Sequence, residues 1–115
     1  MSRRVFQVAA YLQPNDGEPI RSVVHETDDA AIVAWIVKPG QRISPHVHPS
    51  GQDTWTVIAG EGEYQLDASG STMRIAAGDI AVAPADAVHG VLNTGPQDLV
   101  FVSVVSPALS GFQAL

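Results

Sequence analysis

Three of the four histidines of this chain stand at spacings that suit a metal ion. His46 and His48 form a His-x-His pair, and His89 follows about forty residues later. Because alternate residues of an extended strand share a face, the imidazoles of His46 and His48 converge if both lie on one strand. A third imidazole from a neighbouring strand would complete a nitrogen site for zinc, iron, nickel or copper. Taken alone, a His-x-His pair is more often two solvated or hydrogen-bonded side chains, so the spacing leaves both interpretations open.

Composition narrows the class of protein and of partner. The 115 residues suffice for one domain with a core, and 45% of them are hydrophobic. Twelve acidic residues against six basic ones give a net charge of −6, and no basic run exceeds two residues, which argues against nucleic acid and anionic membranes as partners. Without cysteine, a bound ion must be held by nitrogen and oxygen atoms. The apolar run near the start is too short for a membrane span or a clear signal peptide, so we expect a cytoplasmic protein.

The pattern of apolar runs and turns predicts an all-β fold, a sandwich or a barrel. Short runs rich in β-branched and aromatic residues recur at intervals of roughly 8–12 residues between Gly- and Pro-containing turns. Expected strands cover residues 6–12, 30–37, 54–59, 63–67, 72–76, 80–83, 88–92 and 99–105. The pair 63–67 and 72–76 is expected to form a hairpin. The short segment of residues 107–115 could form a helical turn at the end of the sequence.

Two stretches of the chain resemble the conserved motifs of the cupin superfamily. The first, Gly40-x5-His46-x-His48-x4-Asp53-x6-Gly60, covers residues 40–60, and the second, Gly78-x5-Pro84-x-Asp86-x2-His89-x3-Asn93, covers residues 78–93. The seventeen residues between them are close to the short spacer of small microbial cupins. The resemblance implies a cupin-type jelly-roll β-barrel, also called a double-stranded β-helix, and a single cupin domain over residues 1–115.

The resemblance also implies a set of metal ligands. Carried over residue by residue, they are His46, His48, Asp53 and His89, holding one divalent transition-metal ion per chain, either Fe, Mn, Ni, Cu or Zn. Asp53 stands where the family has glutamate, and Gln52 is the alternative fourth ligand. We favour Asp53, because only it keeps the six-residue interval to the glycine that closes the motif.

Other features of the two motifs concern the pocket and the turns. Strand alternation places Trp55 on the same face as Asp53, so Trp55 is expected to border the pocket, and Tyr64 is a second candidate for it. Asp86 replaces the turn glycine of the second motif, a mild change because aspartate accepts left-handed backbone geometry. His25 lies in a polar stretch and is expected at the surface.

A fold of this kind hosts many chemistries, so two functional hypotheses stay open. The first is a metal-dependent enzyme, of dioxygenase type or a related lyase or isomerase, acting on a small organic molecule. The second is a non-catalytic module that binds a small ligand or senses it. No residue outside the ligands is identified as a catalytic acid or base. Small cupins usually pair, and the apolar segments 2–12 and 106–115 predict a homodimer.

Overall fold

The computed structural model describes residues 3–115, and nearly all of its regular structure is β-strand. The ten strands are β1 (Ser22–Glu26), β2 (Ala31–Val37), β3 (Arg42–Val47), β4 (Gln52–Ala59), β5 (Glu61–Gln65), β6 (Thr72–Ala76), β7 (Ile80–Ala83), β8 (His89–Leu92), β9 (Leu99–Ser106) and β10 (Gln113–Ala114). One short 3-10 helix, η1 (Val8–Tyr11), precedes them. Within the described chain, no helix is long and apolar enough to cross a membrane.

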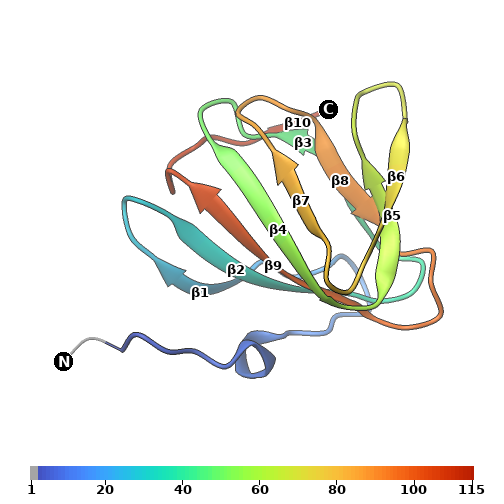
Figure 1. Cartoon of the computed structure of the whole chain (residues 1–115), viewed down its shortest axis with the longest axis horizontal. Helices are drawn as coiled ribbons and strands as arrows, with labels where there is room; N and C mark the ends of the chain where they lie inside the picture. The colour runs from blue at the N-terminus through green and yellow to red at the C-terminus, as the bar shows by residue number, and fades with distance from the viewer. Residues whose placement is uncertain (1–2) are drawn as a thin grey trace.

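The strands form two antiparallel five-stranded sheets that face each other (Figure 1). One sheet has the order β1-β2-β9-β4-β7 and the other β10-β3-β8-β5-β6. Alternating residues of β4 and β9 point between the sheets, where Trp55, Val57 and Phe101 are almost fully buried. This arrangement confirms the predicted jelly roll, and the hairpin of β5 and β6 pairs as expected.

The N-terminal segment differs from its prediction. Residues 6–12 were expected to form a strand, but they contain η1 and run outside the sheets, beneath β1 and β2 (Figure 1). Their apolar side chains are only partly buried; the ring of Phe6, for example, rests against His25 with the ring centroids 5.4 Å apart. The edge strand of this sheet is instead β1, a largely polar segment whose sequence lacks the alternation of apolar and polar residues that would have predicted a strand.

The C-terminal segment also departs from expectation. Residues 107–115 form no helical turn: a bend at residues 107–108 leads into an irregular segment that ends in β10, which pairs with β3. This pairing satisfies backbone groups at an otherwise open edge of the second sheet, which accounts for the strand at the end of the segment.

The turns at the ends of the strands agree with the motif. Asp86 has a φ of +66° and is the one described non-glycine residue with a positive φ, so aspartate does adopt the left-handed geometry at this position. Gly60 combines a φ of +80° with a tight approach to the backbone of Asp98, where an added Cβ would lie 2.3 Å from the carbonyl oxygen. Glycine is therefore required at this second turn.

Asn93 closes the end of the jelly roll that lies beyond the last residue of β8. Its side chain is buried, and the Nδ2 amide donates to the carbonyl oxygens of Val37 and Gln97, both at 2.8 Å. The Oδ1 atom accepts a hydrogen bond from the backbone N–H of Gly95 at 2.9 Å. The side chain of Asn93 thus ties the end of β2 to the turn that follows β8.

Candidate metal centre

Four titratable side chains meet between the two sheets, at the opposite end of β8 from Asn93. His46 lies near the end of β3, and His48 follows that strand. Asp53 lies in β4, and His89 is the first residue of β8. One donor atom from each lies within 4.8 Å of the others, so this cluster could hold a metal ion. His46 and His89 are direct cross-strand partners in the pairing of β3 with β8, which brings their imidazoles together. The structure therefore assembles the four residues that the motifs single out.

All three imidazoles of the cluster are oriented by main-chain carbonyl groups. The Nδ1 atom of His46 lies 2.8 Å from the carbonyl oxygen of Ser44, and that of His89 lies 3.0 Å from the carbonyl oxygen of Ala87. The Nδ1 atom of His48 lies 2.8 Å from the carbonyl oxygen of Gly111. Because a carbonyl can only accept, each Nδ1 carries a proton, which leaves Nε2 as the atom of each ring that can bind a metal once it is deprotonated. Metal-binding histidines are typically held in this way.

The carboxylate of Asp53 completes the cluster. Its Oδ2 atom lies 3.0 Å from Nε2 of His89 and 3.4 Å from Nε2 of His48, so the shorter side chain does reach the imidazoles. Its Oδ1 atom is buried and has no hydrogen-bond partner. Leaving a buried carboxylate oxygen unpaired is costly, and a cation would remove that cost. Gln52 is exposed on the other face of β4 and bonds Thr54, which places it away from the cluster.

The environment shifts the titration of these groups in different directions. Burial lowers the pKa of His46 to about 4, so this imidazole is neutral at physiological pH. For His48, the hydrogen bond to Asp53 raises the pKa. Burial alone would raise the pKa of Asp53, but hydrogen bonds from His48 and His89 outweigh it and bring the value down to about 2. The cluster thus offers an ionised carboxylate and at least one neutral imidazole, as a divalent ion requires.

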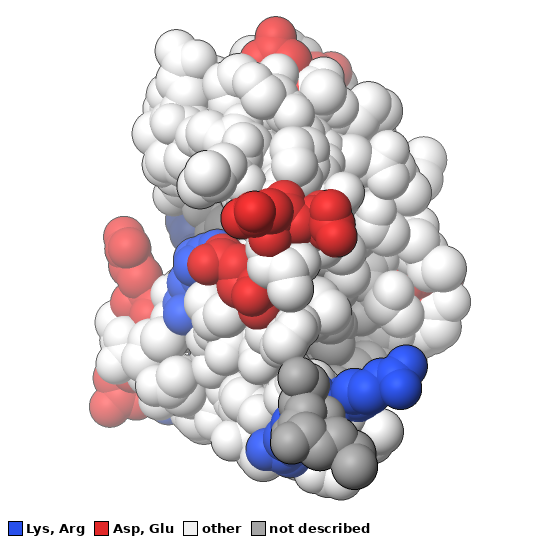
Figure 2. All heavy atoms as spheres, turned by 90° about the vertical axis from the view of Figure 1, so that its left-hand side faces the viewer, with Lys and Arg blue, Asp and Glu red and all other residues white. Residues whose placement is uncertain are grey.

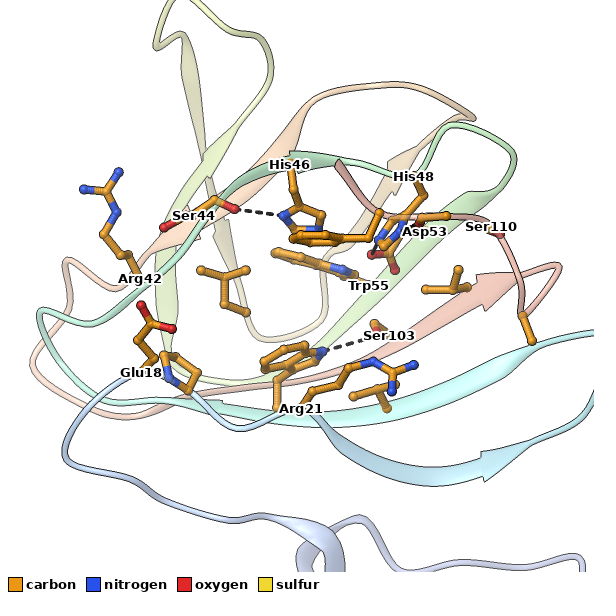
Figure 3. A pocket seen from close by; sticks show the side chains of 18 of the residues that line it. Glu18, Arg21, Arg42, Ser44, His46, His48, Asp53, Trp55, Ser103 and Ser110 are labelled. Atoms are coloured by element: carbon orange, nitrogen blue, oxygen red, sulfur yellow. Dashed lines mark hydrogen bonds and ion pairs between the residues drawn. The ribbon is translucent and has the colours of Figure 1, made fainter. Parts of the chain in front are cut away.

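A cavity of about 580 Å³ adjoins the cluster and is large enough for a small organic molecule (Figure 3). Its wall is mostly apolar and includes Val33, Trp35, Ile43 and Trp55. Charged and polar side chains also border it, namely Glu18, Arg21, Arg42, Ser44, Ser103 and Ser110 (Figure 3). The face of the molecule shown in Figure 2 is mainly uncharged, with acidic side chains near its centre and basic side chains beside them and lower on the face.

Trp55 and Tyr64, both expected near the pocket, occupy different places. Trp55 lines the cavity, and its buried Nε1–H has no hydrogen-bond partner. Tyr64 packs edge-on against Trp55, with ring centroids 5.2 Å apart, and belongs to the buried core and not to the cavity wall. Burial raises the pKa of its phenol. Both residues are buried, and the indole of Trp55 lines the cavity while it contacts the ring of Tyr64.

Comparison with known proteins agrees with this geometry. The family model of the cupin domain matches residues 33–105. The chain belongs to the cupin family. A crystal structure of an uncharacterized conserved protein with a double-stranded β-helix domain, from Klebsiella pneumoniae subsp. pneumoniae MGH 78578, superposes on this cupin with a TM-score of 0.95. The two share 52% sequence identity, and the match covers 98% of this chain and 97% of the other.

Curated relatives match part of this cupin. "Polyketide synthase CurC" of Streptomyces cyaneus is 33% identical over 72 residues, which cover 63% of this chain and 46% of that protein. "Oxalate-binding protein" of Thermotoga maritima (strain ATCC 43589 / DSM 3109 / JCM 10099 / NBRC 100826 / MSB8) is 30% identical over 67 residues, or 58% of this chain and 54% of that protein. The cupin therefore spans about half the length of the curated relatives it matches.

Several residues of the site in this cupin were not found from the sequence. Trp35 donates from Nε1 to Ser103 Oγ at 3.3 Å inside the cavity, and Gly111 and Phe112 lie beside the imidazoles. In the pairing of β2 with β9, Trp35 stands opposite Phe101 and Ser103 stands opposite Val33, so Trp35 and Ser103 are diagonal neighbours that the sequence alone does not bring together. Gly111 and Phe112 lie after the last motif residue, and no local pattern marks them.

Proposed function

We propose that this cupin is a single cupin domain that binds one divalent transition-metal ion per chain. The ligands would be Nε2 of His46, His48 and His89 and a carboxylate oxygen of Asp53. One observation carries the proposal: every Nδ1 of the three imidazoles is tied to a carbonyl, while the carboxylate keeps a buried, unpaired oxygen. A set of three imidazoles and one carboxylate suits Fe, Mn, Ni, Cu or Zn.

We further propose that the site is enzymatic, of dioxygenase type or a related lyase or isomerase type, acting on a small organic molecule. A bound divalent ion supplies Lewis-acid chemistry and, if it is redox-active, electron transfer. The chain would contribute a pocket beside it, in which Trp35 and Trp55 exclude water and contact the apolar part of the substrate. Arg21 and Arg42 also line this cavity, and their positive charge favours a substrate that carries negative charge.

A second candidate function is ligand binding without catalysis. It is favoured because few side chains that line the cavity could act as a general acid or base. Among the described residues that line it, the carboxylates are Glu18 and Asp53 alone, and Glu18 is exposed. General acid–base catalysis needs a positioned group within hydrogen-bond reach of the substrate. A relative that matches this chain is named for binding oxalate, which is compatible with a role in capturing a small anion.

Elemental analysis would test the metal proposal. The protein is purified without a histidine tag or chelator and compared with the double variant His46→Ala/His48→Ala, with His25→Ala as a control because His25 lies outside the cluster. We expect near-stoichiometric metal in the parent and in the control and none in the double variant. Parent protein that is metal-free and cannot be loaded with any of the five ions would overturn the proposal.

Ligand titration would separate the enzyme from the binding module. The chain has two tryptophans, and both line the cavity, so their fluorescence reports on its occupation. The loaded protein is titrated with oxalate and a panel of aromatic and aliphatic carboxylates, and oxygen uptake and product formation are recorded in parallel. Turnover of a bound compound supports the enzyme, while saturable quenching by compounds that are all recovered unchanged supports the binding module.

We also propose that the protein is a homodimer. Apolar side chains at both ends of the described chain are exposed, including Val5, Leu109 and Phe112. Exposed apolar side chains at the ends of a small domain suit burial against a second copy. Light scattering at micromolar concentration should give twice the chain mass, and a mass near 12.1 kDa would overturn this proposal.

A further inference from the structure

The last nine residues, 107–115, form a strap that runs from the end of β9 across to β3, the strand that carries His46 (Figure 1). Gln113 and Ala114 pair with Val47 and His46 in β3, so the strap continues the second sheet. The carbonyl oxygen of Ser110 accepts a hydrogen bond from the backbone N–H of Ser50 at 2.9 Å. The strap is therefore attached both to the His-x-His segment itself and to the turn that follows it.

Gly51 shows how closely the strap is seated. A Cβ atom added to Gly51 would lie 1.7 Å from Oγ and 2.4 Å from Cβ of Ser110, whose side chain is buried. Any larger residue at position 51 would push the strap away from the turn that follows His48. The turn and the strap are thus matched in shape.

The strap also orients one of the three imidazoles. His46 and His89 are each held by a carbonyl two residues earlier in their own segment. His48 differs, because its Nδ1–H donates to Gly111, 63 residues further along the chain. Without that carbonyl, the proton of neutral His48 is free to move to Nε2, which would remove the lone pair that faces the cluster.

Phe112 lies against the outer side of the same cluster. Its ring is nearly parallel to that of His46, with centroids 5.2 Å apart and an interplanar angle of 29°, and its centroid lies 6.2 Å from that of His48. The ring also lines the cavity while keeping 68% of its surface exposed. It therefore covers the imidazoles from the solvent side and forms part of the cavity entrance.

We propose that the strap is a positioning element of the metal site: Gly111 fixes the tautomer of His48 that presents Nε2, and Phe112 shields the imidazoles from water. This inference rests on the proposed metal function. The match to the cupin family model ends at residue 105, so the strap lies outside the part of the chain that the family model describes. The metal site of this protein would then depend on a segment that the two motifs do not include.

The first test compares metal affinity in three variants. One variant ends at Ser110, the second is Phe112→Ala, and the control is Leu115→Ala, an exposed strap residue that does not line the cavity. Affinity for Co²⁺ and Zn²⁺ is measured by competition with a chromophoric chelator, and the d–d absorption of bound Co²⁺ reports the coordination geometry. Loss of the partners that orient metal ligands typically lowers affinity about 10–100-fold, which we expect for the truncated chain.

The other two variants sharpen that comparison. Phe112→Ala should weaken binding by a few-fold with an altered Co²⁺ spectrum, and Leu115→Ala should leave both unchanged. A truncated chain that is folded and binds both ions within twofold of the parent would overturn the proposal. If the truncated chain does not fold, Phe112→Ala decides the question, because an affinity and spectrum equal to those of the parent would then overturn it.

A second test needs no metal and so separates this inference from the proposed function. Long-range ¹H–¹⁵N spectra of the metal-free protein at pH about 9, where imidazoles are neutral, identify the tautomer of each histidine. We expect the Nδ1–H form for His48 in the parent and a shift toward the Nε2–H form in the truncated chain, with His46 and His89 unchanged. An unchanged His48 tautomer would overturn the role of Gly111, whether or not the parent binds metal.

Discussion

The two ends of β8 hold buried polar side chains in opposite states. At one end, the amide of Asn93 has a partner for both of its polar atoms. At the other end, beside His89, the Oδ1 atom of Asp53 and the Nε1–H of Trp55 are equally buried and have none. The four residues of β8 therefore separate a group of buried polar atoms that all have hydrogen-bond partners from a group in which two have none.

We interpret this difference as a distinction between polar groups that stabilise the fold and polar groups that could bind a ligand. A buried polar group without a partner costs free energy, and such groups are rare in native proteins. The polar atoms of Asn93 are therefore satisfied within the fold, whereas the Oδ1 atom of Asp53 would gain a partner if a metal ion bound to it. We expect substitutions at the Asn93 end to affect stability and substitutions at the Asp53 end to affect binding.

Asp53→Asn should produce the largest effect. The amide has the shape of the carboxylate but lacks its charge, so affinity for Zn²⁺ should fall more than about 100-fold, beyond the typical effect of losing an indirect partner. The thermal midpoint of the metal-free protein should fall only modestly, because the charge is lost but the amide oxygen can still accept hydrogen bonds from the imidazoles of His48 and His89. Chelator competition and calorimetry measure the two quantities. If the variant lost much of its stability but kept its affinity for Zn²⁺, Asp53 would serve the fold and not metal binding, contrary to the prediction.

Asn93→Ala should produce the complementary result. Removal of the amide leaves the carbonyls of Val37 and Gln97 without their donor, which should lower the free energy of unfolding by about 2 kcal/mol. Urea unfolding measures this change, and Zn²⁺ affinity of the folded variant should remain within twofold of the parent. Weakened metal binding in folded protein would show that the two ends are coupled.

Acidification should weaken metal binding. The pKa of His48 is raised by its hydrogen bond to Asp53, so this imidazole carries a proton to a higher pH than the ordinary value of about 6.5. The proton must leave before Nε2 can bind a metal, and affinity should fall by up to about tenfold per pH unit as pH decreases through this region. Titrations at pH 6 to 8 in buffers of different ionisation enthalpy measure the released proton. A constant affinity over this range would contradict the prediction.

The metal-free protein should respond to pH through His46. Its pKa is lowered by burial to about 4, so below the unfolded value of about 6.5 the unfolded chain binds the proton more readily. This imidazole therefore favours unfolding progressively between pH about 6.5 and 4, by at most about 1.4 kcal/mol per pH unit. His48 acts in the opposite sense, because its raised pKa stabilises the fold at low pH. Replacing His48 by Gln should steepen the loss of stability on acidification; an unchanged slope would contradict the opposed roles.

Trp55→Phe should produce the smallest effect. In Figure 3 the indole of Trp55 points its nitrogen toward Asp53. Phenylalanine fills most of the same space without the N–H, so metal affinity should fall by less than about tenfold, the lower limit typical of an indirect partner. Trp35→Phe is the matched control, since its Nε1–H donates to Ser103 and not toward the cluster. If the two substitutions lowered metal affinity equally, both effects would be due to altered packing and not to the N–H of Trp55.

The sequence predicted the centre of the molecule better than its ends. Motif spacing identified the four residues of the cluster because each interval reflects a fixed geometry of strand and turn, as Asp86 shows with its positive φ. The terminal segments carry no such intervals. Residues 6–12 look like a strand because they form a short apolar run followed by a turn sequence, yet they do not pair with either sheet. Gly111 reaches His48 through a contact that depends on the whole tertiary structure.

The direct pairing of His46 with His89 has a mechanical consequence. These two residues join β3 to β8 in one sheet, while Asp53 belongs to β4 in the other. Any ion held by all of them would therefore cross-link the two sheets at their open edge. A ligand present at 1,000 times its dissociation constant stabilises the folded state by about 4 kcal/mol. Metal supply would then set how long this protein survives heat or proteolysis, independently of any reaction it performs.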